Sequence, residues 1–292
     1  MRSYQIITDS ASDLGEDLRS AYNVEYCAMR LSWQGHDVPA DLDWGGESAR
    51  QYYAALRGGR RVAVSPVPED EFRRRFEKCA GADIDVLYIG CSGALCDSYS
   101  VAVRVARAVM DDHPSVTIRC VDSLHVGLGE GMIAVAAALL REKEKSLDQT
   151  ADYIEENRDR FFQFVTTDKY RYLLRAGHVG AARAFWGALL DRRPILVADP
   201  HGRPCVAETV RRRVSALQAL VRRTAQAVEP GTTGTFYVAH ADCEREAEAV
   251  AAMLRQRLPS ATVRVQSVGP VAGSIVGPGA VAVFGYAGEL PR

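Results

Sequence analysis

The sequence has almost no excess of charge of either sign. Its 36 Lys and Arg residues stand against 37 Asp and Glu residues, which gives a formal net charge of −1 at pH 7. No global field therefore recruits nucleic acid or an anionic membrane surface. Lysine is scarce, because only four of the 36 basic residues are Lys, at positions 78, 143, 145 and 169. We attribute this bias towards Arg to GC-rich coding and infer no function from it.

Long apolar runs are also missing. The longest one, at residues 132–140, is far shorter than the roughly 20 residues that a membrane-spanning helix needs. Residues 1–10 are typical of a strand that enters a polar turn, with neither a basic segment nor an apolar leader segment. We therefore expect a soluble, cytoplasmic protein with no membrane span and no nucleic-acid partner.

The cysteines are too few and too scattered for a disulfide framework. There are seven, at positions 27, 79, 91, 96, 120, 205 and 243, and reduced thiols are the expectation. No pair has zinc-ligand spacing with a nearby His, so we predict no metal. The glycine run at 127–131 lacks the third glycine of a dinucleotide fingerprint, because position 132 is Met. This run indicates close helix packing and no cofactor, with Glu130 favoured by the helix N-terminus.

The pattern of apolar residues predicts an α/β fold with two domains. The chain of 292 residues is 47% hydrophobic, which suffices for two ordinary cores. Short apolar runs alternate with segments of helical spacing. The expected strands lie at 4–7, 24–31, 86–89, 116–121, 161–166, 195–198, 205–210, 236–239, 262–268 and 281–286. We place the boundary so that residues 1–160 form the first domain and residues 161–292 the second.

The stretch at residues 86–107 is typical of a strand, a loop and a helix. Ligands of open α/β sheets bind beyond the carboxyl ends of the strands. The loop at 91–98 is therefore the expected place for a site, and it holds two thiols, two hydroxyls and a carboxylate: Cys91, Cys96, Ser92, Ser98 and Asp97.

Five short motifs, spread in order along the whole chain, resemble the DegV family of fatty-acid-binding proteins. They are T-D-S-A-S-D-L at 8–14, V-D-S at 121–123 with Gly127 and Gly129, Arg211 and Arg213 after Glu208, A-H-A-D at 239–242, and the Gly- and Pro-rich run at 269–280. The resemblance implies two α/β domains that clasp a long acyl chain in a tunnel between them. It also implies a partner kinase at the tunnel mouth, for which Arg211 and Arg213 are candidate contacts. An acyl-carrier protein is a second candidate partner.

The resemblance also implies where the ligand head group binds. The corresponding positions are Ser10, Val64, Ser65, Cys96, Ser98, Ile275 and Gly277. Here Val64 stands where the family has Thr, Cys96 where it has Ser, and Ile275 where it has His. Two neighbours also differ, since His178 replaces Arg and Asp97 replaces Gly.

These departures lead to two expectations for function. An ionised carboxylate is costly to bury without donors, and Val64 and Ile275 each remove one. We therefore expect a carrier of an acyl or other hydrophobic ligand whose head group is neutral. The alternative is a thioesterase or acyltransferase in which Cys96 is the nucleophile, His178 the base and Asp97 the orienting carboxylate. Cys96 and His178 each also have a purely structural interpretation, as a packing residue and as a turn residue, so both functions stay open.

Overall fold

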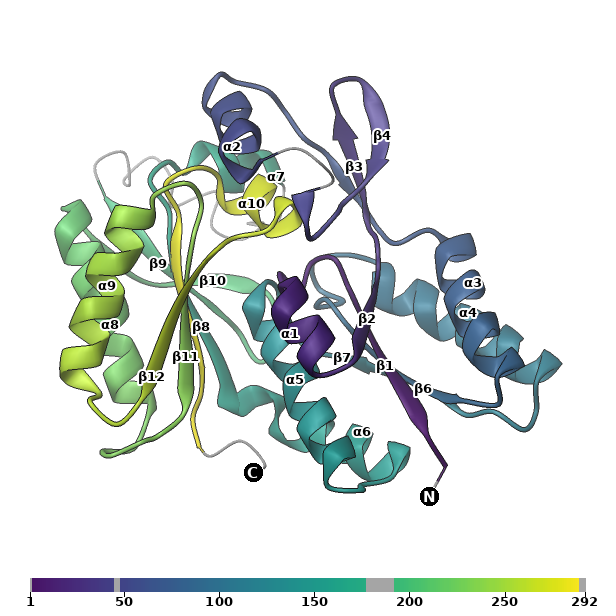
Figure 1. The fold of residues 1–292 in the computed structure, drawn as a ribbon. Helices are drawn as coiled ribbons and strands as arrows, with labels where there is room; N and C mark the ends of the chain where they lie inside the picture. Colours follow the sequence, from purple (N-terminus) through teal and green to yellow (C-terminus); the bar gives the residue numbers. More distant parts are fainter. Residues whose placement is uncertain (1, 45–47, 177–191, 289–292) are drawn as a thin grey trace. The chain divides into compact units, whose positions relative to one another are not determined.

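The computed structural model of the protein describes residues 2–44, 48–176 and 192–288. The chain divides into two compact units (Figure 1). The first comprises Met1–Gly45, Val64–Asp159 and Pro291–Arg292, and the second comprises Gly46–Ala63 and Arg160–Leu290.

A parallel four-stranded sheet forms the centre of the first unit. Its strands, in the spatial order β2-β1-β6-β7, are β2 (Val24–Cys27), β1 (Tyr4–Asp9), β6 (Asp85–Gly90) and β7 (Ile118–Asp122). Every residue of β6 is buried, as expected for a strand covered on both faces of a parallel sheet. All four strands therefore end at one edge of the sheet, where the loops that follow them meet.

Five helices connect or cover these strands. They are α1 (Glu16–Ala21), α3 (Glu69–Gly81), α4 (Ser98–Asp112), α5 (Leu128–Glu142) and α6 (Leu147–Asn157). Helices α3 and α4 lie beside each other, and α5 contacts both α6 and β1 (Figure 1). Helix α5 is buried over most of its length. Its first turn lies against the end of β1, because Glu130 hydrogen-bonds to Thr8 and Asp9. A small antiparallel sheet, β4 (His36–Pro39), β3 (Arg30–Trp33) and β5 (Val64–Ser65), completes the unit.

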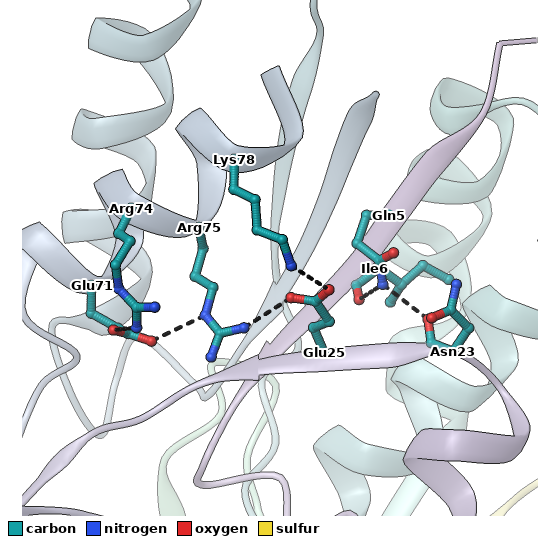
Figure 2. Close-up of polar contacts among 8 residues, drawn as sticks. All are labelled: Gln5, Ile6, Asn23, Glu25, Glu71, Arg74, Arg75 and Lys78. Atoms are coloured by element: carbon teal, nitrogen blue, oxygen red, sulfur yellow. Dashed lines mark hydrogen bonds and ion pairs between the residues drawn. The ribbon is translucent and has the colours of Figure 1, made fainter. Parts of the chain in front are cut away.

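Charged side chains connect α3 to the edge strand β2 (Figure 2). Glu25 on β2 accepts from Arg75 at 2.9 Å and pairs with Lys78 at 3.5 Å. Arg75 also donates to Glu71 at 3.2 Å, and Arg74 pairs with the same carboxylate. Charged side chains along an edge strand oppose pairing with another chain. This network protects the edge of the sheet and has no geometry that suggests catalysis.

The second unit is built on a mixed six-stranded sheet with the order β10-β9-β8-β13-β11-β12. Its strands are β10 (Pro204–Val210), β9 (Arg193–Ala198), β8 (Phe161–Thr166), β13 (Val281–Tyr286), β11 (Thr235–His240) and β12 (Thr262–Ser267). Among the described strands of this sheet, β11 and β12 pair in parallel and the other neighbours are antiparallel. A 3-10 turn at Arg158–Arg160 precedes β8, and β9 and β10 form a hairpin around Gly202.

Two long helices pack their apolar sides on this sheet. They are α8 (Arg213–Ala227) and α9 (Glu244–Arg257), which lie side by side (Figure 1). Their core includes Leu220, Leu254 and Val283, all fully buried. A smaller apolar cluster around Leu173 and Leu196 involves α7 (Arg171–Ala176) and α10 (Pro270–Val276). The predicted α/β class is thus confirmed.

Helix α2 (Ala49–Arg57) belongs to the second unit, although the sequence-based boundary at residue 160 assigns it to the first domain. Two tyrosines on α2 explain this difference. The hydroxyl of Tyr52 donates to the Pro270 carbonyl at 2.8 Å, and that of Tyr53 donates to the Val268 carbonyl at 2.7 Å. Both rings are buried. Long-range contacts of this kind leave no local signal in the sequence.

Candidate functional site

The strongest concentration of buried polar groups lies where β1 and β6 end. Asp9, the last residue of β1, is fully buried. Its Oδ2 accepts from the Tyr88 hydroxyl at 2.8 Å and from the Cys91 backbone N–H at 3.1 Å, and its Oδ1 accepts from the Ala11 N–H at 2.9 Å. Three donors from two neighbouring strand ends therefore converge on one carboxyl group.

A second carboxyl group lies against the first. Glu130, in the first turn of α5, is fully buried, and its Oε1 accepts from the Thr8 hydroxyl at 2.7 Å and from the Asp9 N–H at 3.4 Å. Burial raises the pKa of Glu130 well above its usual range, and the Asp9 charge raises it further. Burial also raises the pKa of Asp9, although its backbone hydrogen bonds oppose this shift.

The contact between the two carboxyl groups affects their protonation. Two adjacent carboxylates cannot both be charged cheaply in a buried site. Burial and the neighbouring Asp9 charge therefore both favour the protonated form of Glu130 by raising its pKa. Glu130 lies in the first turn of α5, as the sequence predicts, but its side chain hydrogen-bonds to Thr8 and Asp9 of β1. The pair fastens α5 to the end of β1.

Two thiols lie next to this pair, in the loop between β6 and α4. Cys91 is buried, as expected for a residue at a strand end, whereas Cys96 is partly exposed. The Cys91 thiol hydrogen-bonds to Cys96, which lowers the pKa of Cys96 and, together with burial, raises that of Cys91 well above its usual range. Cys96 Sγ also lies 3.4 Å from Ser98 Oγ.

The predicted head-group hydroxyls take part in hydrogen bonds to the backbone. Ser10 is fully buried and its Oγ accepts from the Met29 N–H at 2.9 Å. Ser98 is fully buried as well and its Oγ accepts from the Val67 N–H at 3.1 Å. Each hydroxyl keeps its own hydrogen to donate. Of the neighbouring β5 residues, Val64 is partly buried and pairs with Leu31, while Ser65 is exposed.

The remaining two head-group candidates lie in the second unit. Ile275, on α10, packs against the cluster of Leu173 and Leu196. Gly277 follows α10 with a φ of +75°, and a Cβ there would lie 2.2 Å from the Tyr172 ring. Glycine is thus required at position 277 by both the backbone and the packing, whatever the ligand.

The proposed catalytic residues are only partly described. His178 lies outside the described residues, so its proximity to Cys96 stays a prediction. Asp97 is exposed, and its backbone carbonyl accepts from the Val101 N–H and the Ser100 hydroxyl. Among the residues that the structure describes, the side chains that hydrogen-bond to the Cys96 thiol are those of Cys91 and Ser98. Neither is a general base of the kind that the thioesterase hypothesis needs.

The two candidate partner contacts differ in environment. Arg211 is exposed in the turn before α8. Arg213 is partly buried, and its Nη2 donates to Glu246 and to the Gly279 carbonyl, both at 2.6 Å. Arg213 therefore has a structural role within its unit, and Arg211 is the residue available to a partner.

The sequence pattern did not single out Thr8 or Tyr88 as members of the buried cluster. A tyrosine within an otherwise aliphatic buried strand carries a signal that could have identified it, because a buried phenol needs a hydrogen-bond partner. Thr8 carries no such signal, since it lies in a motif that reads equally well as a turn.

Comparison with known proteins places the chain in a family. The model of the DegV family, described as "Uncharacterised protein, DegV family", matches residues 3–287. The chain belongs to the DegV family. A DegV domain-containing protein of Clostridium perfringens is 27% identical over 284 residues, which cover 97% of each chain.

Solved DegV structures have the same fold over their full length. A DegV family protein from Thermus thermophilus, described by its fatty-acid binding, has a TM-score of 0.87 at 25% identity, with 98% of this chain and 100% of that chain covered. The fatty-acid-binding DegV of Bacillus subtilis has a TM-score of 0.83 at 21% identity, with 97% and 99% covered. The predicted membership and α/β fold are confirmed. Among the helices of the described residues, none has the length and apolar character needed to cross a membrane.

Proposed function

We propose that this DegV protein binds a long acyl chain, as its Thermus thermophilus relative is described to do. The observation that carries the proposal is the full-length match to that relative, with a TM-score of 0.87 and 100% of its chain covered. Because the match leaves out no domain of the relative, the parts of the fold that could hold an acyl chain have counterparts here. An apolar tunnel that holds the acyl chain is part of this proposal.

The binding test is displacement of a fluorescent fatty-acid analogue by unlabelled acyl compounds of increasing chain length. Each methylene that leaves water contributes about 0.8 kcal/mol, which is roughly a fourfold gain in affinity per carbon. We expect the affinity to rise with chain length and then to level off when the tunnel is full. Affinity that does not depend on chain length would refute the proposal.

The finer proposal concerns the head group, which we infer to be neutral. Val64 and Ile275 provide no hydrogen-bond donor, and Ser10 and Ser98 provide one hydroxyl hydrogen each. A buried hydrogen bond to a charged group contributes about 1.5–3 kcal/mol, so a carboxylate that lacks two donors binds poorly. The positions of these residues around the ligand rest on the family resemblance.

Comparison of a fatty acid with its methyl ester tests this inference. We expect the wild-type protein to bind the ester more tightly. Val64→Thr restores one donor with little change of shape and should improve the affinity for the acid, relative to the ester, by at least about tenfold. Val64→Ala, which changes the volume without adding a donor, is the matched control. A wild-type protein that prefers the acid would contradict the inference and leave the acyl-binding proposal intact.

The thioesterase alternative is tested with the same protein and an acyl thioester. A carrier binds the thioester and releases no thiol over hours, whereas an enzyme turns it over and loses this activity in Cys96→Ser. We place the carrier first, because the thiol contacts described for Cys96 are to Cys91 and Ser98.

A further inference from the structure

The loop between β6 and α4 brings two of the seven cysteines into contact. The Leu95 N–H and the Cys96 N–H both donate to the Ser92 carbonyl, at 2.9 Å and 3.2 Å. These bonds fold the loop back on itself, so that the thiol at its start hydrogen-bonds to the thiol at its end. Two cysteines at the two ends of one short turn are therefore candidates for a disulfide within it.

The two thiols differ in the way that redox-active pairs do. Cys96 is partly exposed and Cys91 is buried. Cys96 also precedes α4, whose N-terminal end favours negative charge. Its pKa is lowered, chiefly by the hydrogen bond from Cys91, and a lower pKa means more of the nucleophilic thiolate.

The other cysteines lack this combination. Burial raises the pKa of Cys27 and Cys79, and it raises the pKa of Cys120 and Cys243 to about 12. Cys205 is exposed, but its pKa is raised too. Of the seven cysteines, Cys96 alone combines partial exposure with a lowered pKa, and Cys91 is the cysteine that hydrogen-bonds to it.

We propose that Cys91 and Cys96 form a redox-active pair, which a hydroperoxide converts into a disulfide within the loop. The Cys96 thiolate attacks one peroxide oxygen, the O–O bond breaks, and the leaving oxygen takes a proton to become water or an alcohol. Cys96 is then a sulfenic acid. The Cys91 sulfur attacks the Cys96 sulfur, the S–O bond breaks, and hydroxide leaves as water with the Cys91 proton. Two electrons pass from the two thiols to the peroxide.

The disulfide would change the first turn of α4. Cys96 Sγ would exchange its contact with Ser98 for a covalent bond to Cys91. Ser98 Oγ holds the Val67 N–H at 3.1 Å, so the segment that follows β5 would respond to the oxidation state of the loop. This proposal does not depend on which ligand the protein binds.

The test uses the full-length reduced protein treated with hydrogen peroxide. After treatment the protein is unfolded, free thiols are alkylated, and the sample is cleaved before aspartates, which releases residues 85–96 with only Cys91 and Cys96 in one peptide. We expect this peptide to escape alkylation and to be lighter by two hydrogens. Whole-protein labelling should fall from seven alkylated cysteines to five, because two of the seven are lost.

Three variants sharpen the test. Cys91→Ser should stop at the sulfenic acid, which a cyclic diketone traps on Cys96. Cys96→Ser should leave Cys91 fully alkylated, and Cys120→Ser, the control, should oxidise like the wild type. Peptide 85–96 that stays fully alkylated in the wild type would overturn the proposal, as would Cys205 that oxidises faster than Cys96.

Discussion

The buried carboxyl pair makes stability depend on pH in a direction that can be calculated. Replacing Glu130 by Gln keeps an oxygen for the Thr8 hydroxyl and an N–H for Asp9, but removes the titration. The pKa of Glu130 is raised by burial in the folded protein. Once the pH exceeds the ordinary pKa of a glutamate, the unfolded chain releases a proton that the folded protein keeps. The contribution of Glu130 to the stability of the wild type is therefore fully present below the unfolded-state pKa. It is lost as the pH rises towards the folded-state pKa.

The magnitude follows from proton linkage. Within this window the folded state binds one more proton than the unfolded state, which costs about 1.4 kcal/mol of unfolding free energy for each pH unit. Urea unfolding of wild type and Glu130→Gln at several values between about pH 5 and pH 8 measures this slope. The free energy of unfolding of Glu130→Gln should rise relative to that of the wild type as the pH rises. Glu142→Gln, at the exposed end of the same helix, should show the same pH dependence of the unfolding free energy as the wild type.

Two results would refute this reasoning. Parallel curves for wild type and Glu130→Gln would mean that Glu130 has the same pKa in the folded and unfolded states. If the unfolding free energy of the wild type rose relative to that of the variant with rising pH, the folded-state pKa of Glu130 would be depressed and its side chain charged.

Three further predictions concern stability. Asp9→Asn leaves a buried donor without an acceptor and should cost about 1–3 kcal/mol, measured by urea unfolding; no loss would show that the three donors do not depend on the charge. Gly277→Ala should lower the melting temperature, because its φ of +75° and the Tyr172 ring both oppose a Cβ; a Tm equal to that of the wild type would contradict the requirement for glycine in this turn. Arg75→Met should cost no more than about 1 kcal/mol, and less at high salt, because its ion pairs are partly exposed; a loss that does not change with salt would contradict this account.

Local pattern predicted much of the fold. The run at residues 281–286 is β13 as predicted, and the run at 86–89 lies within β6. Helix α10 escaped prediction because its seven residues lie between glycines and prolines and carry no helical period of apolar residues. The assignment of α2 to the second unit depends on bonds from Tyr53 to Val268 and from Tyr52 to Pro270, which are separated by more than 200 residues.

The site was harder to predict than the fold. The crowded loop at 91–98 indicated a site, but the contact between Cys91 and Cys96 was not predicted. The glycines beside Glu130 correctly indicated a helix start. Its hydrogen bond to Thr8 was not predicted, because the two residues are 122 positions apart in the sequence.

Native mass spectrometry of the protein purified from cells tests acyl-chain binding most directly. Gentle ionisation preserves a ligand held in an apolar site, and the mass difference between native and denatured protein identifies it. We predict a bound species with the mass of a long acyl compound, and by the head-group inference an ester, amide or thioester rather than a free acid. Protein that carries no lipid, and that also fails to bind a panel of fatty acids and their methyl esters, would contradict the account.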